Sequence, residues 1–371
     1  MSKVAKEVVH QIRFTGDKQL QETLLKDRSL KRETDAMLKD QTKHAKKHLR
    51  SLLGQSLRVS LSSSPEIYRQ FLHCQETLHL EDKELHPFIY NSHEINAYCF
   101  YDGNEITIGV SSQLIKTMSH KELTFIIGHE FGHALYEHYR LPAFGLCQGH
   151  LPPSKALKLM SWSRQAEISA DRAGLLCCED IDAATISFIK MSCGLGEPYI
   201  SFDIDDFISQ VDEIEKLENA DNADECYSTH PLSPLRVLAL NNFWLSDSYT
   251  QFFKSEDSGE ISDEEMDKKI FEILNYMEPE SSKKKRTKTK SKQDDFLILS
   301  SYYVASADED LAKKELNSLI DIYGKDIVDA FLSKVKEQKD VKKFLAKELK
   351  KASILFKKSK KPTKCSAIQK I

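Results

Sequence analysis

Apolar side chains recur along most of this chain at the three- and four-residue intervals of an amphipathic helix. Residues 17–54 are dense in charged side chains and carry leucines at partly helical spacing. This pattern predicts either one or two helices with a solvated outer face or a partner-binding arm. Further helices are predicted in the segments 65–78, 119–135, 164–174, 183–193, 206–217, 233–244 and 262–277.

One region follows a different pattern. Residues 88–90, 95–101 and 104–109 are rich in β-branched and aromatic side chains, and Asp102-Gly103 separates the last two runs. An Asp-Gly dipeptide between such runs is typical of a β-hairpin. The sequence therefore predicts an α+β fold in which helices dominate around a small β-sheet.

The predicted helix at residues 119–135 begins at a capping box and contains a H-E-x-x-H pattern at residues 129–133. Side chains four residues apart project from the same face of a helix, so His129 and His133 can bind one metal ion together. Glu130 lies beside them and can act on a metal-bound water without being a ligand. The pattern predicts a metal centre on this helix.

A second stretch offers the third ligand. A catalytic zinc ion usually has three protein ligands and one open position, and Glu167 can complete the set. Asp171 lies one helical turn further on and can accept the outer N–H of a ligand histidine. Alone, these two carboxylates would indicate a solvated helix face, but with H-E-x-x-H they favour a zinc site. His138 and His150 lack the spacing of a further helical ligand, and we interpret both as non-ligands.

These residues, with Asn96-Ala97 upstream, resemble the gluzincin endopeptidases of peptidase family 48, which include the CAAX prenyl proteases and the HtpX-like bacterial proteases. A later segment, His230-Pro231 followed by Arg236, is similar to an element that these enzymes carry after the third ligand. The resemblance covers roughly residues 60–245. It implies a zincin-like metallopeptidase domain that binds one zinc ion per chain.

The position of Glu130 predicts that it accepts a proton from the zinc-activated water and then donates one to the leaving amine. On the resemblance, His230 and Arg236 stabilise the oxyanion or orient the substrate. The resemblance also implies that the strand at Asn96 and Ala97 binds an extended peptide, unless the hairpin is only structural. Two other roles stay open for His230: closing the fourth zinc position, or capping the helix that follows.

The 371 residues are 40% hydrophobic and 30% charged, with no apolar run near the roughly 18–20 residues of a membrane-spanning helix. The first residues lack the apolar segment of a signal peptide. We therefore expect a cytoplasmic protein without a transmembrane segment. The net charge of −4 and a short basic run without aromatic residues at 280–293 give no reason to expect a specific nucleic-acid partner.

Changes in composition predict several domains. Residues 305–310 and the helix after them are weakly similar to the TerB-like helical module, so the C-terminal domain is a candidate site for a protein partner. The predicted parts are an N-terminal helical extension (1–58), a zinc metallopeptidase domain (59–246), a helical connector (247–279), a basic flexible linker (280–295) and a C-terminal helical domain (296–371).

The sequence thus predicts a zinc-dependent endopeptidase that hydrolyses protein or peptide substrates. Two alternatives stay open: an aminopeptidase-type metallohydrolase, and a non-catalytic interaction protein stabilised by zinc. The chain has no Gly-x-Met-Glu-Asn motif for binding a free amine, which argues against the first. The intact Glu130 argues against the second.

Overall fold

This computed structural model describes residues 6–148, 151–216, 225–254 and 258–278, together with Val328 and Leu332. The chain divides into two compact units, residues 1–151 with 155–283 and residues 152–154 with 284–371. Apart from residues 152–154, the elements below belong to the first unit. The predicted basic linker lies outside the described residues, and so does the predicted C-terminal helical domain except for Val328 and Leu332.

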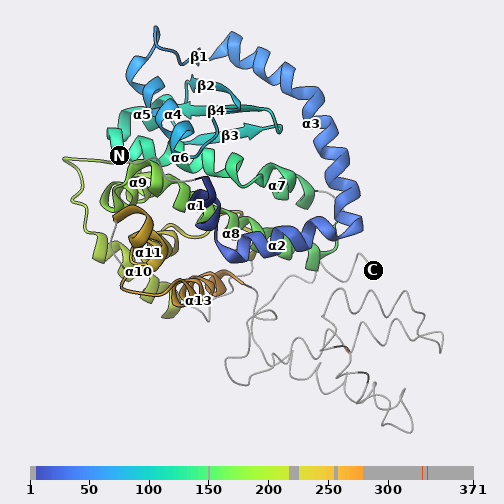
Figure 1. Ribbon diagram of the computed structural model, residues 1–371, viewed down its shortest axis with the longest axis vertical. Helices are drawn as coiled ribbons and strands as arrows, with labels where there is room; N and C mark the ends of the chain where they lie inside the picture. The colour runs from blue at the N-terminus through green and yellow to red at the C-terminus, as the bar shows by residue number, and fades with distance from the viewer. Residues whose placement is uncertain are drawn as a thin grey trace, which may run out of the picture. The chain divides into compact units, whose positions relative to one another are not determined.

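The described part of the chain is mainly helical, and the predicted α+β fold with a small sheet is confirmed (Figure 1). The α-helices are α1 (Lys6–Gln11), α2 (Thr15–Lys26), α3 (Arg28–Gln55), α4 (Pro65–Thr77), α5 (Ser112–Thr117), α6 (His120–Leu135), α7 (Ala143–Cys147), α8 (Pro153–Cys178), α9 (Ile181–Cys193), α10 (Ile204–Lys216), α11 (Ser233–Trp244), α12 (Asp247–Tyr249) and α13 (Asp263–Leu274). The strands are β1 (Leu57–Arg58), β2 (Glu84–Tyr90), β3 (Ala97–Tyr101) and β4 (Glu105–Ser111). Short helical turns are η1 (His138–Arg140), η2 (Glu225–Tyr227), η3 (Thr250–Lys254) and η4 (Asn275–Met277).

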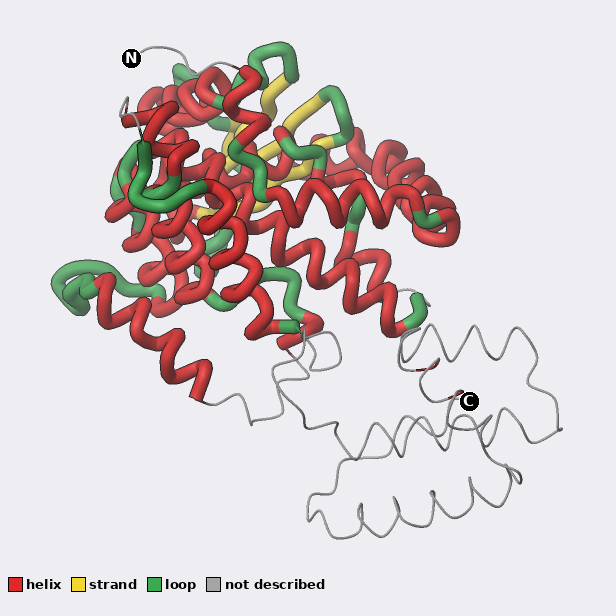
Figure 2. Tube along the Cα trace, turned by 60° about the horizontal axis from the view of Figure 1, so that its bottom comes forward, coloured by secondary structure: helices red, strands yellow, loops and turns green. Residues whose placement is uncertain are grey.

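The strands form one mixed sheet in the order β1-β2-β4-β3. β3 and β4 are the predicted antiparallel hairpin, and Gly103 in its turn has a φ of 105°, which favours glycine. β2 pairs parallel with β4 and antiparallel with β1, two pairings that the side-chain pattern does not predict. Figure 2 shows the strands gathered within the helical unit. Because β3 stands at the end of the strand order and pairs with β4 on one side, it is an edge strand of the described sheet.

Helix α6 packs against β3 and β4 and joins the same hydrophobic core. It begins at the predicted capping box, in which the Glu122 N–H donates to Ser119 Oγ and the Ser119 N–H donates to the Glu122 carboxylate. Both bonds satisfy amides that would otherwise lack partners at the start of the helix. Lys190 of α9 also donates to the Glu122 carboxylate, at 2.7 Å. The start of the helix that carries H-E-x-x-H is thus fixed.

Helices α6 and α8 approach each other backbone to backbone. A Cβ atom at Gly132 would lie 2.9 Å from the Ala170 Cα and 2.9 Å from the Ala173 Cβ. A Cβ atom at Gly174 would lie 2.6 Å from the carbonyl oxygen of Phe125. Small residues on both helices make this approach possible, and it brings the predicted metal ligands of the two helices face to face.

The N-terminal segment is packed into the same unit. Ile12 and Phe14 are buried, and Arg172 Nη1 of α8 donates to the Ile12 carbonyl at 2.8 Å. The Phe14 N–H donates to Ser169 Oγ at 3.2 Å, and the Phe14 ring lies 4.9 Å from that of Phe271 on α13. Within residues 17–54, Leu24 of α2 and Leu30 of α3 are buried in one cluster with Trp162 of α8, which favours the prediction of helices over that of a partner-binding arm.

Gly132→Ala tests the close approach of α6 and α8. The added methyl group meets the backbone of α8, so we expect the free energy of unfolding to fall by about 1–3 kcal/mol in urea titrations. Gly54→Ala in α3 is the control, because its methyl group meets no atom within 4 Å. That change should stabilise the protein by at most about 1 kcal/mol. Equal stability of Gly132→Ala and wild type would contradict the close packing.

Candidate metal centre

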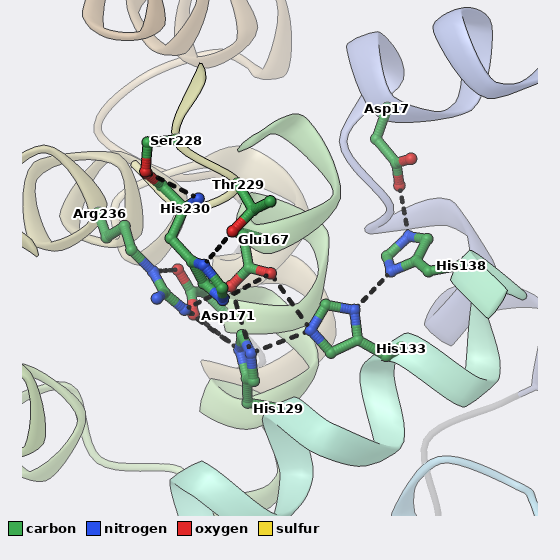
Figure 3. Close-up of polar contacts among 10 residues, drawn as sticks. All are labelled: Asp17, His129, His133, His138, Glu167, Asp171, Ser228, Thr229, His230 and Arg236. Atoms are coloured by element: carbon green, nitrogen blue, oxygen red, sulfur yellow. Dashed lines mark hydrogen bonds and ion pairs between the residues drawn. The ribbon is translucent and has the colours of Figure 1, made fainter. Parts of the chain in front are cut away.

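Three side chains from α6 and α8 converge on one point (Figure 3). The Nε2 atoms of His129 and His133 lie 3.1 Å apart. Glu167 Oε2 lies 3.5 Å from His129 Nε2, and Glu167 Oε1 lies 3.5 Å from His133 Nε2. Donor atoms about 2.0–2.1 Å from a tetrahedral zinc ion lie roughly 3.3–3.4 Å from one another. The spacing of these three donors therefore fits a zinc ion.

The surroundings of Glu167 also fit a cation. Its side chain is buried, and its Oε2 atom accepts no hydrogen bond from the described residues. Burial opposes its ionisation, but His230, Arg236 and the two ligand histidines lower the pKa of Glu167 to about 2. Two imidazoles and one anionic carboxylate, with a fourth position left open, are the donor set of a catalytic zinc site.

Asp171 lies directly behind His129. The distance between Asp171 Oδ1 and His129 Nδ1 is 2.9 Å, so the ring donates its Nδ1 proton to the carboxylate and directs Nε2 toward Glu167. Arg236 donates from Nε to Asp171 Oδ2 at 2.9 Å and from Nη2 to Oδ1 at 2.6 Å. Its Nη2 atom also lies 3.2 Å from Glu167 Oε2. Arg236 is buried behind the ligands and holds two of the site's carboxylates.

His133 is held by residues that the sequence analysis did not select. Its Nδ1 atom lies 2.9 Å from Nδ1 of His138, and Nε2 of His138 lies 3.1 Å from Oδ2 of Asp17 in α2. His138 follows His133 by five residues, so the two side chains can meet only because the chain changes direction after α6. No sequence pattern links Asp17 to this site. His150, the other histidine interpreted as a non-ligand, lies outside the described residues.

Glu130 lies beside the donors, and the main-chain N–H of Cys99 in β3 hydrogen-bonds to its carboxylate. Burial is the main reason that the pKa of Glu130 is raised to about 7. His129, Arg236 and the Cys99 N–H oppose the shift, and the charge of Glu167 adds to it. A carboxyl group with a pKa near neutrality can both accept and donate a proton. The predicted base therefore has a suitable environment.

The edge strand β3 presents main-chain groups to the same place. The Ser111 N–H donates to the Asn96 carbonyl at 2.9 Å, so Asn96 just before β3 uses this group within the hairpin. Hydrogen-bonding direction alternates along an antiparallel pair, so the main-chain groups of Ala97 and Cys99 point to the free edge. The contact between Cys99 and Glu130 agrees with this. Of the two predicted substrate-binding residues, Ala97 is the one whose main-chain groups point away from β4, the strand paired with β3 in the described part of the chain.

His230 lies on the open side of the centre. Its side chain is 60% exposed, and its Nε2 atom lies 3.4 Å from Glu167 Oε1. Thr229 Oγ1 lies 2.8 Å from its Nδ1 atom. The alternative that His230 caps the following helix is wrong, because Leu232 is the N-cap residue of α11 and no side chain caps it. Its side chain faces the ligand cluster instead.

Arg164 holds the segment that leads to His230. This buried side chain donates from Nη1 to the carbonyl oxygens of Cys226 and Ser228, at 2.9 and 3.1 Å. Its Nη2 atom donates to Glu278 at 2.7 Å. The sequence analysis did not identify Arg164 as a functional candidate, because its partners lie more than sixty residues further along the chain.

A second group of donors lies across β2 and β4, where Glu84, His86 and Glu105 come within reach of one another. The side chains of Glu84 and Glu105 are 68% and 48% exposed. Both carboxylates are therefore well hydrated without a metal ion. Of the two groups found among the described residues, the buried one on α6 and α8 is the better metal site.

The mainly helical α+β fold and a buried centre of two histidines and one glutamate are those of a zincin-like domain. Residues 62–151 and 150–243 match the sequence profile of peptidase family M48. The chain belongs to peptidase family M48 through this region, and the predicted family is confirmed. The TerB-like similarity concerns residues 305–310 and beyond, which apart from Val328 and Leu332 are not described.

The chain is also similar to a protein of Arabidopsis thaliana, plastoglobule-localized metallopeptidase 48, chloroplastic. The two are 26% identical over 173 residues, which is 43% of this chain and 49% of the relative. This chain thus spans about half the length of that curated relative. No solved structure matches the chain significantly. None of the described helices is long and apolar enough to cross a membrane.

Replacing Glu167 by Gln tests the ligand set. The amide is a poorer donor and carries no charge, so we expect the affinity for zinc to fall by more than about 100-fold, measured by competition with a chromophoric chelator. Glu105→Gln, in the exposed group on the sheet, is the control and should bind zinc as wild type does. Loss of zinc from the control, with full binding by Glu167→Gln, would place the metal at the sheet.

Proposed function

We propose that this chain is a zinc-dependent endopeptidase that hydrolyses internal peptide bonds of protein substrates. The proposal rests above all on the three donors of His129, His133 and Glu167, which lie 3.1–3.5 Å apart beside a buried Glu130. A bound zinc ion would supply a Lewis acid that activates water and polarises the substrate carbonyl.

Glu130 would serve as general base and then as general acid. Its raised pKa suits it to take a proton from water and to deliver one to the leaving amine. The hydrogen bond from the Cys99 N–H holds its carboxylate beside the edge of the sheet. The proton carrier and the strand proposed to bind the substrate are therefore adjacent.

The edge of β3 would bind the substrate as an extended strand. Main-chain pairing with the free groups of Ala97 recognises a peptide without contacting either of its termini. This favours an endopeptidase over an aminopeptidase, which must bind a free amine. A non-catalytic interaction protein would have no need of a carboxylate with the pKa and position of Glu130.

His230 and Arg236 would have different roles. His230 is exposed next to the donors. With Thr229 Oγ1 donating to its Nδ1 atom, the ring would carry its proton on Nε2, which lies 3.4 Å from Glu167 Oε1 and could instead donate to an oxyanion. Arg236 is buried, and its contacts with Asp171 and Glu167 favour a positioning role. A cytoplasmic location and a protein partner for the C-terminal region stay predictions.

Glu130→Gln should abolish hydrolysis while zinc stays near one equivalent, because the side chain carries protons and is not a ligand. The assay is digestion of a peptide library with and without chelator, read by mass spectrometry. Glu137→Gln is the matched control, an exposed glutamate just beyond the same helix, and should keep wild-type activity. Chelator-sensitive cleavage at internal positions is expected for the wild type.

Undiminished turnover by Glu130→Gln would remove the proposed mechanism. Release of single amino-terminal residues alone would indicate the aminopeptidase. Stoichiometric zinc with no cleavage of any library by the wild type would indicate the interaction protein.

His230→Ala separates the two roles left open for this residue. If the imidazole stabilises the oxyanion, as we expect, kcat falls by about 100-fold and the affinity for zinc is unchanged. If His230 instead closes the fourth zinc position, kcat rises. Steady-state kinetics and chelator competition on the same preparation give both quantities, and His93→Ala on the sheet side of the unit is a control for loss of an exposed histidine.

A further inference from the structure

We propose that Asp17 and His138 are positioning residues of the metal centre, which hold His133 in the tautomer whose Nε2 lone pair faces the ion. Asp17 Oδ2 lies 3.1 Å from His138 Nε2, and His138 Nδ1 lies 2.9 Å from His133 Nδ1 (Figure 3). This inference rests on the proposed zinc site and adds two residues to it, of which Asp17 lies outside the region matched by the family profile.

The donors around Asp17 determine where the proton of His138 lies. Arg13 donates to the Asp17 carboxylate from Nε at 2.7 Å and from Nη2 at 2.9 Å, and Trp162 Nε1 donates at 2.9 Å. Arginine and tryptophan side chains can only donate, so the carboxylate is an acceptor throughout. The close contact with His138 Nε2 is therefore a bond that the histidine donates.

The next step follows from the chemistry of imidazole. A neutral His138 ring that donates from Nε2 has its lone pair on Nδ1 and can only accept there. His133 must then donate from its own Nδ1, which leaves the lone pair on Nε2. That atom faces Glu167 Oε1 at 3.5 Å and His129 Nε2 at 3.1 Å. Asp17 thus fixes the metal-binding form of His133 through one intervening ring.

Backbone and ring contacts fix His138 in place. Glu137 has a φ of 54°, in the left-handed region, and this turns the chain back after α6 so that His138 faces His133. The His138 ring lies 5.8 Å from those of Tyr136 and Trp162. The ring is therefore oriented without any metal ion, as a positioning residue must be.

Each of the two ligand histidines is thus linked by hydrogen bonds to a buried carboxylate. His129 donates directly to Asp171 of α8, whereas His133 reaches its carboxylate through His138. Both carboxylates are fully buried, with exposures of 0% for Asp17 and 1% for Asp171. Loss of such a partner typically weakens metal binding by about 10–100-fold.

A purely structural role is the competing explanation, because Asp17 also anchors α2. Ser169 Oγ of α8 donates to Asp17 Oδ2 at 2.7 Å and accepts the Phe14 N–H. An anchor alone would change the stability of the fold with no specific effect on zinc. The affinity of the folded protein for zinc and the tautomer of His133 distinguish the two explanations.

The experiment compares four variants of the full chain for zinc affinity, by competition with a chromophoric chelator at one pH, and for stability of the zinc-free form in urea. His138→Phe keeps the aromatic packing and removes both hydrogen bonds. His138→Gln keeps an acceptor for His133 and a donor for Asp17. Asp17→Asn keeps the volume without the charge, and Ser169→Ala loosens the same anchor without touching His138.

We expect His138→Phe to weaken zinc binding by about 10–100-fold and Asp17→Asn by about 10-fold. His138→Gln should recover most of the loss. Ser169→Ala should lower stability and leave the affinity within about twofold, as expected of an anchor outside the metal site. In zinc-free protein labelled with ¹⁵N-histidine, NMR should show His133 protonated on Nδ1.

Equal zinc affinity in wild type and all variants would overturn the inference, and so would a His133 ring protonated on Nε2. A loss in Ser169→Ala as large as that in Asp17→Asn would reduce Asp17 to an anchor. Failure of the wild type itself to bind zinc would contradict the proposed function instead, so the two failures are distinguishable.

Discussion

The site depends on the contact between two helices that have almost no side chains between them. Gly132 on α6 faces Ala170 and Ala173 on α8, and a Cβ atom there would meet the α8 backbone. Only at this separation can one carboxylate of α8 reach both imidazoles of α6. A wider spacing would separate the buried Glu167 carboxylate from the two imidazoles, and burying a charge away from its partners is unfavourable.

Charge sets a second constraint on the centre. Glu167 and Asp171 carry two negative charges in a buried place, and Arg236 compensates one of them. Glu130 beside them keeps its proton more readily because burial raises its pKa to about 7. A divalent cation would neutralise the remaining negative charge and would make it easier for Glu130 to lose its proton. The buried carboxylates that form and position the site therefore also make the binding of a cation electrostatically favourable.

The sequence predicted those parts of the structure that depend on local contacts. H-E-x-x-H within a capped helix and Asp-Gly within a hairpin are each specified by a few neighbouring residues, and both form as expected. Glu167 was selected because a catalytic zinc ion needs a third ligand, and the resemblance then supported it, but the spacing of residues could not show that the two helices meet. The parallel pairing of β2 with β4 was not predicted, since neither strand alone indicates its neighbour. Arg164 and Asp17 were missed for the same reason, as their partners are distant in sequence.

The geometry of α6 explains why a partner from the N-terminal segment is used at all. His129 lies in the middle of the helix, where α8 runs alongside and offers Asp171. His133 lies one turn further on, two residues before the end of the helix at Leu135, and its outer nitrogen faces away from Asp171 toward the chain that follows. A residue that hydrogen-bonds to the outer nitrogen of His133 has to come from the elements packed against this end of α6. These elements are η1 and, behind it, α2. The family profile begins at residue 62, yet the packing that orients its second histidine begins at residue 17. The functional unit is therefore larger than the region by which the family is recognised.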